Sequence, residues 1–569
     1  MDDAFRKEMT DGYALTGPGI VFGAPMKGGE LAGDIRVGVG LSMVNRHGLI
    51  AGATGTGKTK TLQLLAGQLS AQGVPVFVAD IKGDLTGLAM PGDPTNPNVA
   101  ERVTAMAWPY AALGHPVELL SLSGKLGAQV RASVSSFGPL LLGKILDLND
   151  TQTSILSLVF KYCDDKNLPL LDVADLATTL KMLASEDGKP ILAEYGGMSS
   201  ASVGVLLRSL ITLEQEGADV FFGEPSFDVA DLMRTTPDGK GVISLLELSD
   251  VMAKPRLFST FMLWMLAQLY QTLPEAGDLP KPKLAFFFDE AHLLFTDASS
   301  ALMQQVELTV RLIRSKGVGV YFVTQAPTDV PPSVLAQLGN RVQHALRAFT
   351  PQDADNLRKA ARTFPITTHY DVEETLTSLG IGEAFVTVLS ARGIPTPLAA
   401  TRLLPPDSLM GAMPPEELQT RVATGMLVSR YGTPIDRESA HEIISRQVEA
   451  ARAVAAAAAG VDPAVAATMT AAELRKARKD REAADARAQR EALKEQQRLE
   501  REAQKAVEKA QRDLLQEQQK MAREEQAARE RAQAAMTRQT SGRRRRSAKA
   551  PADPTEHLIR SVFGTLFGK

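Results

Sequence analysis

The chain has 569 residues, of which 44% are hydrophobic and 5% aromatic, and its formal net charge is −3. This length exceeds what one ordinary core organises, so several domains are expected. The charge gives no global basic excess of the kind that indicates nucleic-acid binding, although a locally basic groove remains compatible with it. The lone cysteine, Cys163, excludes an internal disulfide framework and a multi-cysteine metal site.

Membrane insertion and secretion are not indicated. No apolar run approaches the roughly 20 residues that span a bilayer. Residues 1–5 lack the basic and apolar regions of a signal peptide. The sequence therefore predicts a cytoplasmic protein without a membrane partner.

The chain changes character several times. Residues 1–45 contain many glycines and short apolar runs, and are expected to form a short β-rich segment. From 46 to 138, and again from 236 to 405, strand-like apolar runs alternate with stretches of helical spacing. That alternation predicts an α/β core, in which helices cover a parallel sheet. Between 139 and 235 the apolar residues keep helical spacing, which predicts an all-helical insertion.

Residues 52–59 read Gly-Ala-Thr-Gly-Thr-Gly-Lys-Thr and complete the phosphate-binding pattern G-x-x-x-x-G-K-[ST]. An apolar run precedes the loop and helical spacing follows it, which is the context that the pattern requires. Backbone N–H groups of such a loop surround the β- and γ-phosphates of a nucleoside triphosphate at the positive end of a helix. Lys58 supplies a charge to these phosphates, and the Thr59 hydroxyl is placed to ligate Mg²⁺. The residues expected to contact ATP are Gly52, Ala53, Thr54, Gly55, Thr56, Gly57, Lys58, Thr59 and Lys60.

The apolar run 283–288 ends in two acids, Asp289 and Glu290. We expect Asp289 to hold the coordination shell of Mg²⁺, directly or through water, and Glu290 to act as general base toward the attacking water. The alternative is a pair of exposed acids that open a helix, which would also suit the helix dipole. The complete phosphate loop upstream favours the catalytic interpretation.

Other polar residues follow predicted strands. Asp80 or Asp84 could assist Mg²⁺ or sense the nucleotide, because the carboxyl ends of parallel strands face the ligand crevice. For Asp84, a helix cap is an equal alternative. The amide of Gln325, after a further strand, is a candidate to hydrogen-bond the γ-phosphate and the nucleophilic water, with simple loop capping as the alternative.

Charge that develops on the γ-phosphate makes an arginine finger worth seeking. The candidates are Arg311, Arg314, Arg341 and Arg347, although a helix-borne arginine is more often solvated or ion-paired. Cys163 is interpreted as a thiol in a helix core, and His292 as local structure or a polar relay.

The C-terminal part is rich in helix-forming residues. Residues 406–469 are expected to form a helical linker region, and 470–540 one long charged helix. Within it Ala486, Leu493, Val507, Leu514, Met521, Ala528 and Ala535 share one heptad phase, which Glu500 interrupts. A weak coiled coil and a solitary solvated helix are equally compatible with this pattern. Residues 541–569 contain a basic linker and an apolar segment, expected to dock on another surface such as a neighbouring subunit.

Together these motifs resemble the HerA/FtsK superfamily of ring-forming, ATP-driven pumps, and look closest to its HerA-like branch typified by the bacterial YjgR protein. The similarity covers about residues 20–405. It rests on residues 45–59, 81–88, 286–295, 311–325 and 337–350.

The resemblance implies a RecA-like ASCE P-loop ATPase core of the α/β class, here with an all-helical insertion and a long helical C-terminal tail. It also implies a hexamer with ATP sites at subunit interfaces. Lys58, Thr59, Asp289 and Glu290 match the two Walker motifs. Gln325 matches the polar sensor, and the trans-acting arginine maps to Arg347 or Arg314.

The function implied is an ATPase that uses ATP and Mg²⁺ and threads double-stranded DNA through a central pore, as a translocase or helicase. The rival interpretation is an ATP-switched assembly or remodelling protein that acts on an unidentified protein partner. The mild acidity and the long C-terminal helix favour this rival. A small-molecule kinase is a third interpretation, which the water-activating position of Glu290 disfavours.

Overall fold

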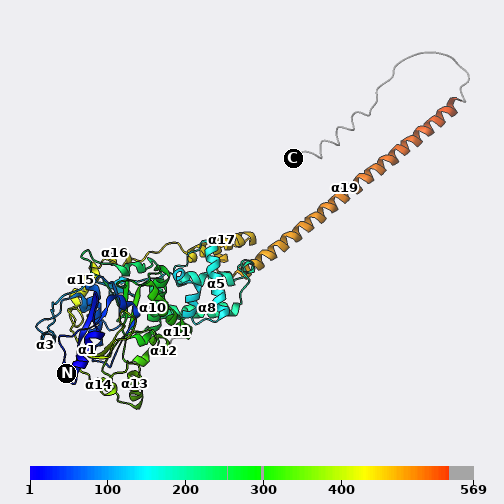
Figure 1. Cartoon of the computed structure of the whole chain (residues 1–569). Coiled ribbons are helices and arrows are strands. Elements are labelled where there is room, and N and C mark those ends of the chain that lie inside the picture. The colour runs from blue at the N-terminus through cyan, green and yellow to red at the C-terminus, as the bar shows by residue number, and fades with distance from the viewer. Residues whose placement is uncertain (253, 296–299, 537–569) are drawn as a thin grey trace. The chain divides into compact units, whose positions relative to one another are not determined.

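The computed structural model describes residues 1–252, 254–295 and 300–536 (Figure 1). The chain divides into two compact units, Met1–Glu449 and Ala450–Lys569. The sheet and all the candidate site residues belong to the first unit.

The centre of the sheet is parallel, and most of its strands are short apolar runs that are buried on both faces. These strands are β4 (Gly48–Ala51), β5 (Val76–Asp80), β6 (Val117–Ser121), β7 (Ala128–Gln129), β8 (Ile243–Glu247), β9 (Leu284–Phe288), β10 (Val318–Thr324) and β11 (Asn340–His344). Within the described residues their order is β11-β4-β10-β9-β5-β8-β6-β7, and every neighbouring pair is parallel.

Antiparallel strands extend the sheet beyond β11. They are β12 (Glu383–Thr387), β13 (Ala399–Leu403), β1 (Gly19–Lys27) and β2 (Glu30–Leu31), with β3 (Val37–Gly40) paired to β1. The strands of the first 45 residues therefore belong to the main sheet.

A helix precedes these first strands, which the glycine-rich composition did not predict. It is α1 (Asp3–Gly12), and the side chain of Asp2 caps it by accepting a hydrogen bond from the Phe5 N–H. Phe5 and Met9 are fully buried on one side of this helix. Their burial stabilises a segment for which sequence patterning indicated only strands and turns.

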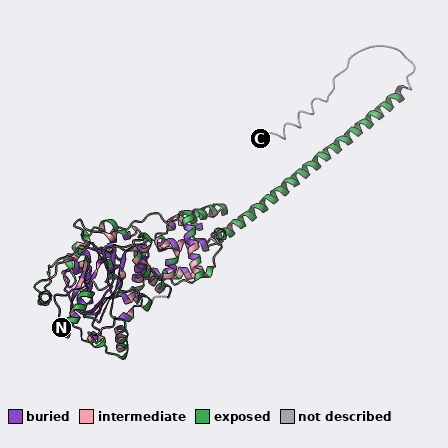
Figure 2. Ribbon diagram, in the orientation of Figure 1, coloured by how far each residue is buried: buried purple, intermediate pink, exposed green. Residues whose placement is uncertain are grey.

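Side chains alternate between two cores, as the period of a strand requires. Phe286 and Phe288 of β9 belong to one core, and Phe286 stacks on Phe77 with ring centroids 4.2 Å apart. Phe287 belongs to the other core and stacks on Tyr321 at 4.9 Å. Figure 2 shows the buried residues concentrated in the sheet. Further helices of this unit are α2 (Lys58–Ala71), α3 (Pro97–Ala105), α10 (Pro255–Thr272), α11 (Ser300–Ile313), α12 (Pro332–Leu335), α13 (Pro351–Ala361) and α14 (Val372–Ser378).

The segment for which an all-helical insertion was expected consists of helices and short turns. It contains α4 (Val134–Ile145), α5 (Asp150–Lys166), α6 (Val173–Ala184), α7 (Lys189–Glu194), α8 (Ser200–Leu213) and α9 (Asp219–Phe221). Cys163 lies in the core of α5, where burial raises the pKa of its thiol to about 12. A thiol with so high a pKa is a poor nucleophile, in keeping with a packing role.

The C-terminal residues are helical. The elements are α15 (Pro415–Thr424), α16 (Val428–Tyr431), α17 (Ala440–Ala459), α18 (Pro463–Ala466) and α19 (Ala471–Met536). Along α19, Leu493, Val507, Leu514 and Met521 are each more than half exposed. The coiled coil stays a prediction, and the segment 541–569 lies outside the described residues. Among the helices that the structure describes, none is both long and apolar enough to cross a membrane.

His47 joins the strand that leads to the phosphate loop to its neighbour in the sheet. Its backbone is left-handed, with φ 57°, and its Nδ1 accepts a hydrogen bond from the Val320 N–H at 3.0 Å. The side chain is buried, and burial lowers its pKa from 6.5 to about 4. In the unfolded chain this histidine is protonated near pH 6.5, whereas in the folded chain it is protonated only near pH 4.

We expect His47 to destabilise the fold by about 3 kcal/mol as the pH falls from 6.5 to 4. His47→Asn, which keeps a hydrogen-bond acceptor but cannot be protonated, should make the pH dependence shallower over this interval. Urea unfolding at several pH values measures it, with His441→Asn on the exposed start of α17 as the control. An unchanged slope in His47→Asn would contradict the assignment.

Candidate nucleotide-binding and hydrolysis site

The phosphate loop connects β4 to α2 in a tightly wound conformation. Gly52, Gly55 and Gly57 have positive φ angles of 156°, 78° and 110°. A Cβ atom on Gly52 would lie only 2.4 Å from Cβ of His344, so no larger residue fits there. The Ala53 N–H donates to the Ala345 carbonyl at 2.8 Å, which ties the loop to the end of β11.

Lys58, the first residue of α2, points its ammonium group into the loop. Nζ donates to the carbonyl oxygens of Gly52 at 2.7 Å and Ala53 at 3.2 Å. The residue is 9% exposed, and burial lowers the pKa of its ammonium group. The loop thus holds a desolvated cation where backbone N–H groups and the helix N-terminus also attract anions.

The buried side chain of His344 contacts the helix that follows the phosphate loop. Sequence analysis did not predict this contact. The Nε2 atom of His344 lies 2.9 Å from Oγ1 of Thr61 in the first turn of α2. Burial, and then the nearby charge of Lys58, lower the pKa of His344 to about 3. The imidazole is therefore neutral near pH 7. Nothing in the sequence distinguished it from an ordinary strand residue.

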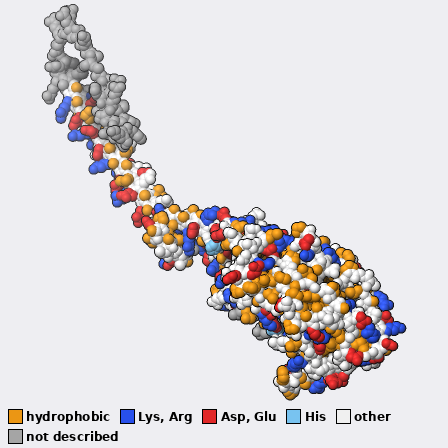
Figure 3. Space-filling model, turned by 90° about the vertical axis from the view of Figure 1, so that its left-hand side faces the viewer, with side chains coloured by type: hydrophobic (Ala, Val, Ile, Leu, Met, Phe, Trp, Pro, Cys, Tyr) orange, Lys and Arg blue, Asp and Glu red, His pale blue; other side chains and the backbone are white. Residues whose placement is uncertain are grey.

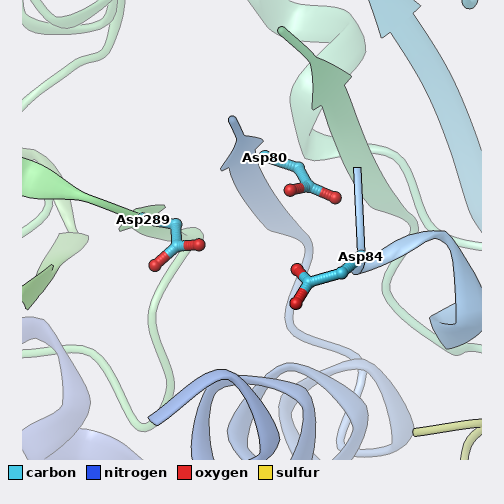
Figure 4. A group of neighbouring side chains, drawn as sticks. All are labelled: Asp80, Asp84 and Asp289. Atoms are coloured by element: carbon cyan, nitrogen blue, oxygen red, sulfur yellow. The ribbon is translucent and has the colours of Figure 1, made fainter. Parts of the chain in front are cut away.

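Three carboxylates converge beside the loop (Figure 4). Asp80 ends β5, Asp289 follows the neighbouring strand β9, and Asp84 lies in the turn after Asp80. An oxygen from each lies within 4.8 Å of the others. Burial, then the charges of Glu290 and Asp80, raise the pKa of Asp289 to about 7. Such mutual destabilisation indicates a place for a cation.

The three carboxylates differ in their hydrogen-bond partners. Asp80 accepts hydrogen bonds from the backbone N–H groups of Lys82, Gly83 and Leu85, and so shapes the turn. Asp84 caps no helix, because the 3-10 turn after it lacks a side-chain cap. Within the described part of the chain, Oδ1 of Asp84 and Oδ2 of Asp289 are buried without a hydrogen-bond partner.

These unpartnered oxygens fit Mg²⁺, which prefers carboxylate, hydroxyl and water oxygens in octahedral geometry. Asp289 and Asp84 are the carboxylates that would hold it. Thr59, in the first turn of α2, would add its hydroxyl. Asp80, whose oxygens are already used by the backbone, is a positioning residue for the turn.

Glu290 follows Asp289 in an unusual conformation. Its φ is 47° and ψ is 48°, in the left-handed region that costs a residue with a side chain about 1–2 kcal/mol. The residue is 6% exposed. Lys82 Nζ donates to its Oε1, and His292 Nδ1 lies 3.3 Å from its Oε2. Sequence analysis included Lys82 in a matching stretch but gave it no role.

Gln325 emerges at the same edge of the sheet, directly after β10. With His292, Phe295 and Asp329 it lines a cavity of about 410 Å³. Asp329 accepts a hydrogen bond from the Thr324 hydroxyl at 2.7 Å, so the preceding strand end is fixed while the Gln325 side chain is exposed. An exposed amide at this edge can reach a ligand.

A second cavity, of about 380 Å³, adjoins the start of α2. Gly57, Lys60 and Thr61 form one side, and Arg102 lies on another. The Arg102 guanidinium donates to the carbonyl oxygens of Ile381 at 2.6 Å and Gly382 at 2.9 Å. The Gly382 N–H in turn donates to the Thr56 carbonyl at 3.0 Å. The space beside the phosphate loop suits a nucleoside, and the sequence gave no signal for it.

Comparison with known proteins shows which family the chain belongs to. The family model described as "Helicase HerA-like C-terminal" matches residues 28–495. The chain belongs to this family. Its membership of the HerA/FtsK superfamily of P-loop NTPases, and its RecA-like α/β fold, are confirmed.

Individual relatives are distant. The DNA double-strand break repair helicase HerA of Sulfolobus acidocaldarius is 22% identical over 376 residues, which cover 62% of this chain and 67% of that protein. The bacterial conjugative coupling protein TrwB is 15% identical with a TM-score of 0.44, covering 68% of this chain and 94% of that structure. VirB4 of Thermoanaerobacter pseudethanolicus is 15% identical with a TM-score of 0.43, covering 71% and 99%.

The candidate arginines of this HerA-family chain lie at different edges of the sheet. Arg347 follows β11 at the phosphate-loop edge, is exposed, and donates to the Thr377 carbonyl at 2.8 Å. Arg314 lies in the turn before β10, at the opposite edge. Arg341 donates to the carbonyl oxygens of Leu335, Leu338 and Thr363, which indicates a structural role. Within one chain the structure brings Lys58, Asp289, Glu290 and Gln325 to one edge, without Arg314.

We expect Asp289→Asn to weaken Mg²⁺ binding in the presence of an ATP analogue at least tenfold, because a charged ligand is lost. Asp84→Asn should weaken it less if a water intervenes. Calorimetric titration with Mg²⁺ measures both, and Asp238→Asn in an exposed turn is the control. Unchanged Mg²⁺ affinity in Asp289→Asn would remove Asp289 from the metal site.

Proposed function

We propose that this chain is an ATP-hydrolysing motor that works as a hexameric ring and moves double-stranded DNA through its centre. One observation carries the proposal: the phosphate loop around Lys58 and the buried pair Asp289 and Glu290 lie at one edge of the sheet, where the acids interact with the Lys58 charge. A phosphate-binding protein needs the loop alone, whereas a hydrolase also needs a metal-holding carboxylate and a base for water. Membership of the HerA-like family supports DNA as the polymer.

The residues of the crevice suit hydrolysis of the γ-phosphate. Lys58 binds the β- and γ-phosphates. Mg²⁺ held by Thr59, Asp289 and Asp84 would supply further neutralisation of charge there. Glu290 takes a proton from a water, whose oxygen bonds to the γ-phosphorus. The bond from that phosphorus to the bridging oxygen breaks, giving ADP and phosphate. Gln325 orients the water through its exposed amide.

The position of Arg314 within one chain supports the proposed assembly. Arg314 lies across the sheet from the phosphate loop, so it can reach a nucleotide only on a neighbouring subunit. Arg347 lies near the loop of its own chain, since Ala345 accepts a hydrogen bond from Ala53. We infer that Arg314 acts in trans and Arg347 in cis.

A second function has specific support. The net charge of −3 offers no general attraction for DNA, and α19 presents exposed apolar side chains along 66 residues of helix. On the face that Figure 3 shows, acidic and basic side chains are interspersed along this helix. These features suit an ATP-switched protein that assembles or remodels a protein partner.

Duplex DNA should raise ATP turnover, and the stimulation should fall steeply between about 50 and 200 mM salt as phosphate contacts weaken. Glu290→Gln should retain ATP and DNA but lose at least 100-fold in turnover. Lys58→Ala should abolish nucleotide binding, with the surface variant Lys240→Ala as its control. Turnover unchanged by saturating DNA, with a Glu290→Gln protein that holds ATP but no DNA, would refute the motor and favour the protein-remodelling function.

Mixing two inactive variants tests the arginines. In a random one-to-one mixture of Arg314→Ala and Glu290→Gln subunits, about one interface in four contains both intact residues. Turnover should recover to about a quarter of the wild-type value because Arg314 acts across the interface. The same mixture with Arg347→Ala should stay inactive. Recovery with Arg347→Ala alone would reverse the two assignments.

A further inference from the structure

Glu290, the residue proposed to activate water, forms an ion pair with Lys82. One carboxylate oxygen of Glu290, Oε1, accepts a hydrogen bond from the ammonium group of Lys82. The Glu290 side chain is 8% exposed, whereas that of Lys82 is 48% exposed. A general base needs a free oxygen within hydrogen-bond reach of the water that it deprotonates. The pair therefore withholds Oε1 from a water, while Oε2 is buried and lies 3.3 Å from Nδ1 of His292.

The backbone of Lys82 is fixed while its side chain is adjustable. The Asp80 carboxylate accepts the N–H groups of Lys82 at 3.1 Å and Gly83 at 2.8 Å, and Gly83 has a φ of 73°. This turn follows β5, whose neighbour β9 leads to Glu290. A lysine carries its charge on a flexible four-carbon stem. The ammonium group can therefore change partner without movement of the turn.

Lys82 also shares its crevice with Lys58. Lys58 is directed into the phosphate loop by its bonds to Gly52 and Ala53. Its pKa is lowered by burial, and the charge of Lys82 adds to that effect. Both lysines feel the charges of Glu290 and Asp289, and two cations near one site are both stabilised when an anion binds there. A terminal phosphate is such an anion.

We propose that Lys82 is a second cation for the γ-phosphate of ATP, and that its transfer from Glu290 to that phosphate releases Glu290 to act on water. This inference rests on the function proposed above. ADP has no γ-phosphate and leaves the Lys82–Glu290 pair intact. Recognition of the triphosphate and release of the base are thus one event, which protects the site from acting on the wrong ligand.

Binding of nucleotides to four proteins tests this assignment without hydrolysis. Affinities for a non-hydrolysable ATP analogue and for ADP are measured in wild type, Lys82→Met, Glu290→Gln and the double variant. Lys82→Met should lose about 10- to 100-fold in analogue affinity, the worth of a charge-assisted hydrogen bond, and less than about twofold in ADP affinity. Methionine keeps the length of the apolar stem, and circular dichroism shows whether the variant is folded.

The double variant tests whether Lys82 and Glu290 affect analogue binding through one another. Glu290→Gln frees Lys82 from its partner, so the analogue should bind more tightly than to wild type. That gain should vanish when Lys82 is already replaced, because the two residues act on one another. Lys82→Arg should restore part of the preference for the triphosphate, and Lys240→Ala should change neither affinity.

Three outcomes would overturn the inference: equal loss of both nucleotides in Lys82→Met, no loss of either, or additive effects in the double variant. An unchanged ratio of analogue to ADP affinity, together with loss of DNA stimulation, would instead assign Lys82 to the polymer. Any of these outcomes in a protein whose wild type hydrolyses ATP leaves the proposed function intact. A wild type that binds no ATP would remove both.

Discussion

Parallel pairing of four strands is the constraint on which the rest of the site depends. The register places Ala51 of β4 beside Thr324 of β10, and Phe288 of β9 beside Ala79 of β5. Each strand is followed at once by a functional residue, so the phosphate loop, Gln325, Asp289 and the Asp80 turn all leave the sheet at one edge. A slip of one residue in any strand would turn its side chains to the opposite face and dismantle the crevice.

The same packing buries several carboxyl groups close together, where desolvation makes their charged forms unfavourable. Burial raises the pKa of Asp80 to about 6 and that of Glu247, its partner on β8, to about 9. Lys82 interacts with the neighbouring acids Glu290, Asp289 and Asp84. The turn after Asp80 binds the Asp80 carboxylate through backbone N–H groups. The cluster opposes folding and attracts cations, a combination that is kept at sites whose ligands supply the missing charge.

Local motifs made the centre of the site predictable, and long-range pairing made the rest unpredictable. The phosphate loop and the acids after β9 are contiguous stretches whose spacing carries their chemistry. The RecA-like core followed from short apolar runs that only a buried parallel sheet explains. Lys82 and Glu290 are 208 residues apart, and His344 meets Thr61 across 283 residues. Hydrophobic periodicity in the sequence does not indicate contacts between residues so far apart in the chain. The helix α1 was missed for the same reason, since the burial of Phe5 and Met9 stabilises it.

Under the proposed function, two separate conditions restrain hydrolysis in the isolated chain. The oxygen of Glu290 that bonds to Lys82 is blocked from water, and Arg314 lies at the far edge of the sheet. We propose that a γ-phosphate removes the first condition and that a neighbouring subunit removes the second. Hydrolysis then requires ATP and assembly together, because each supplies a change that the other does not. A motor that works in this proposed way would hydrolyse ATP only when its subunits are assembled, which links the geometry of one site to the order in which subunits act.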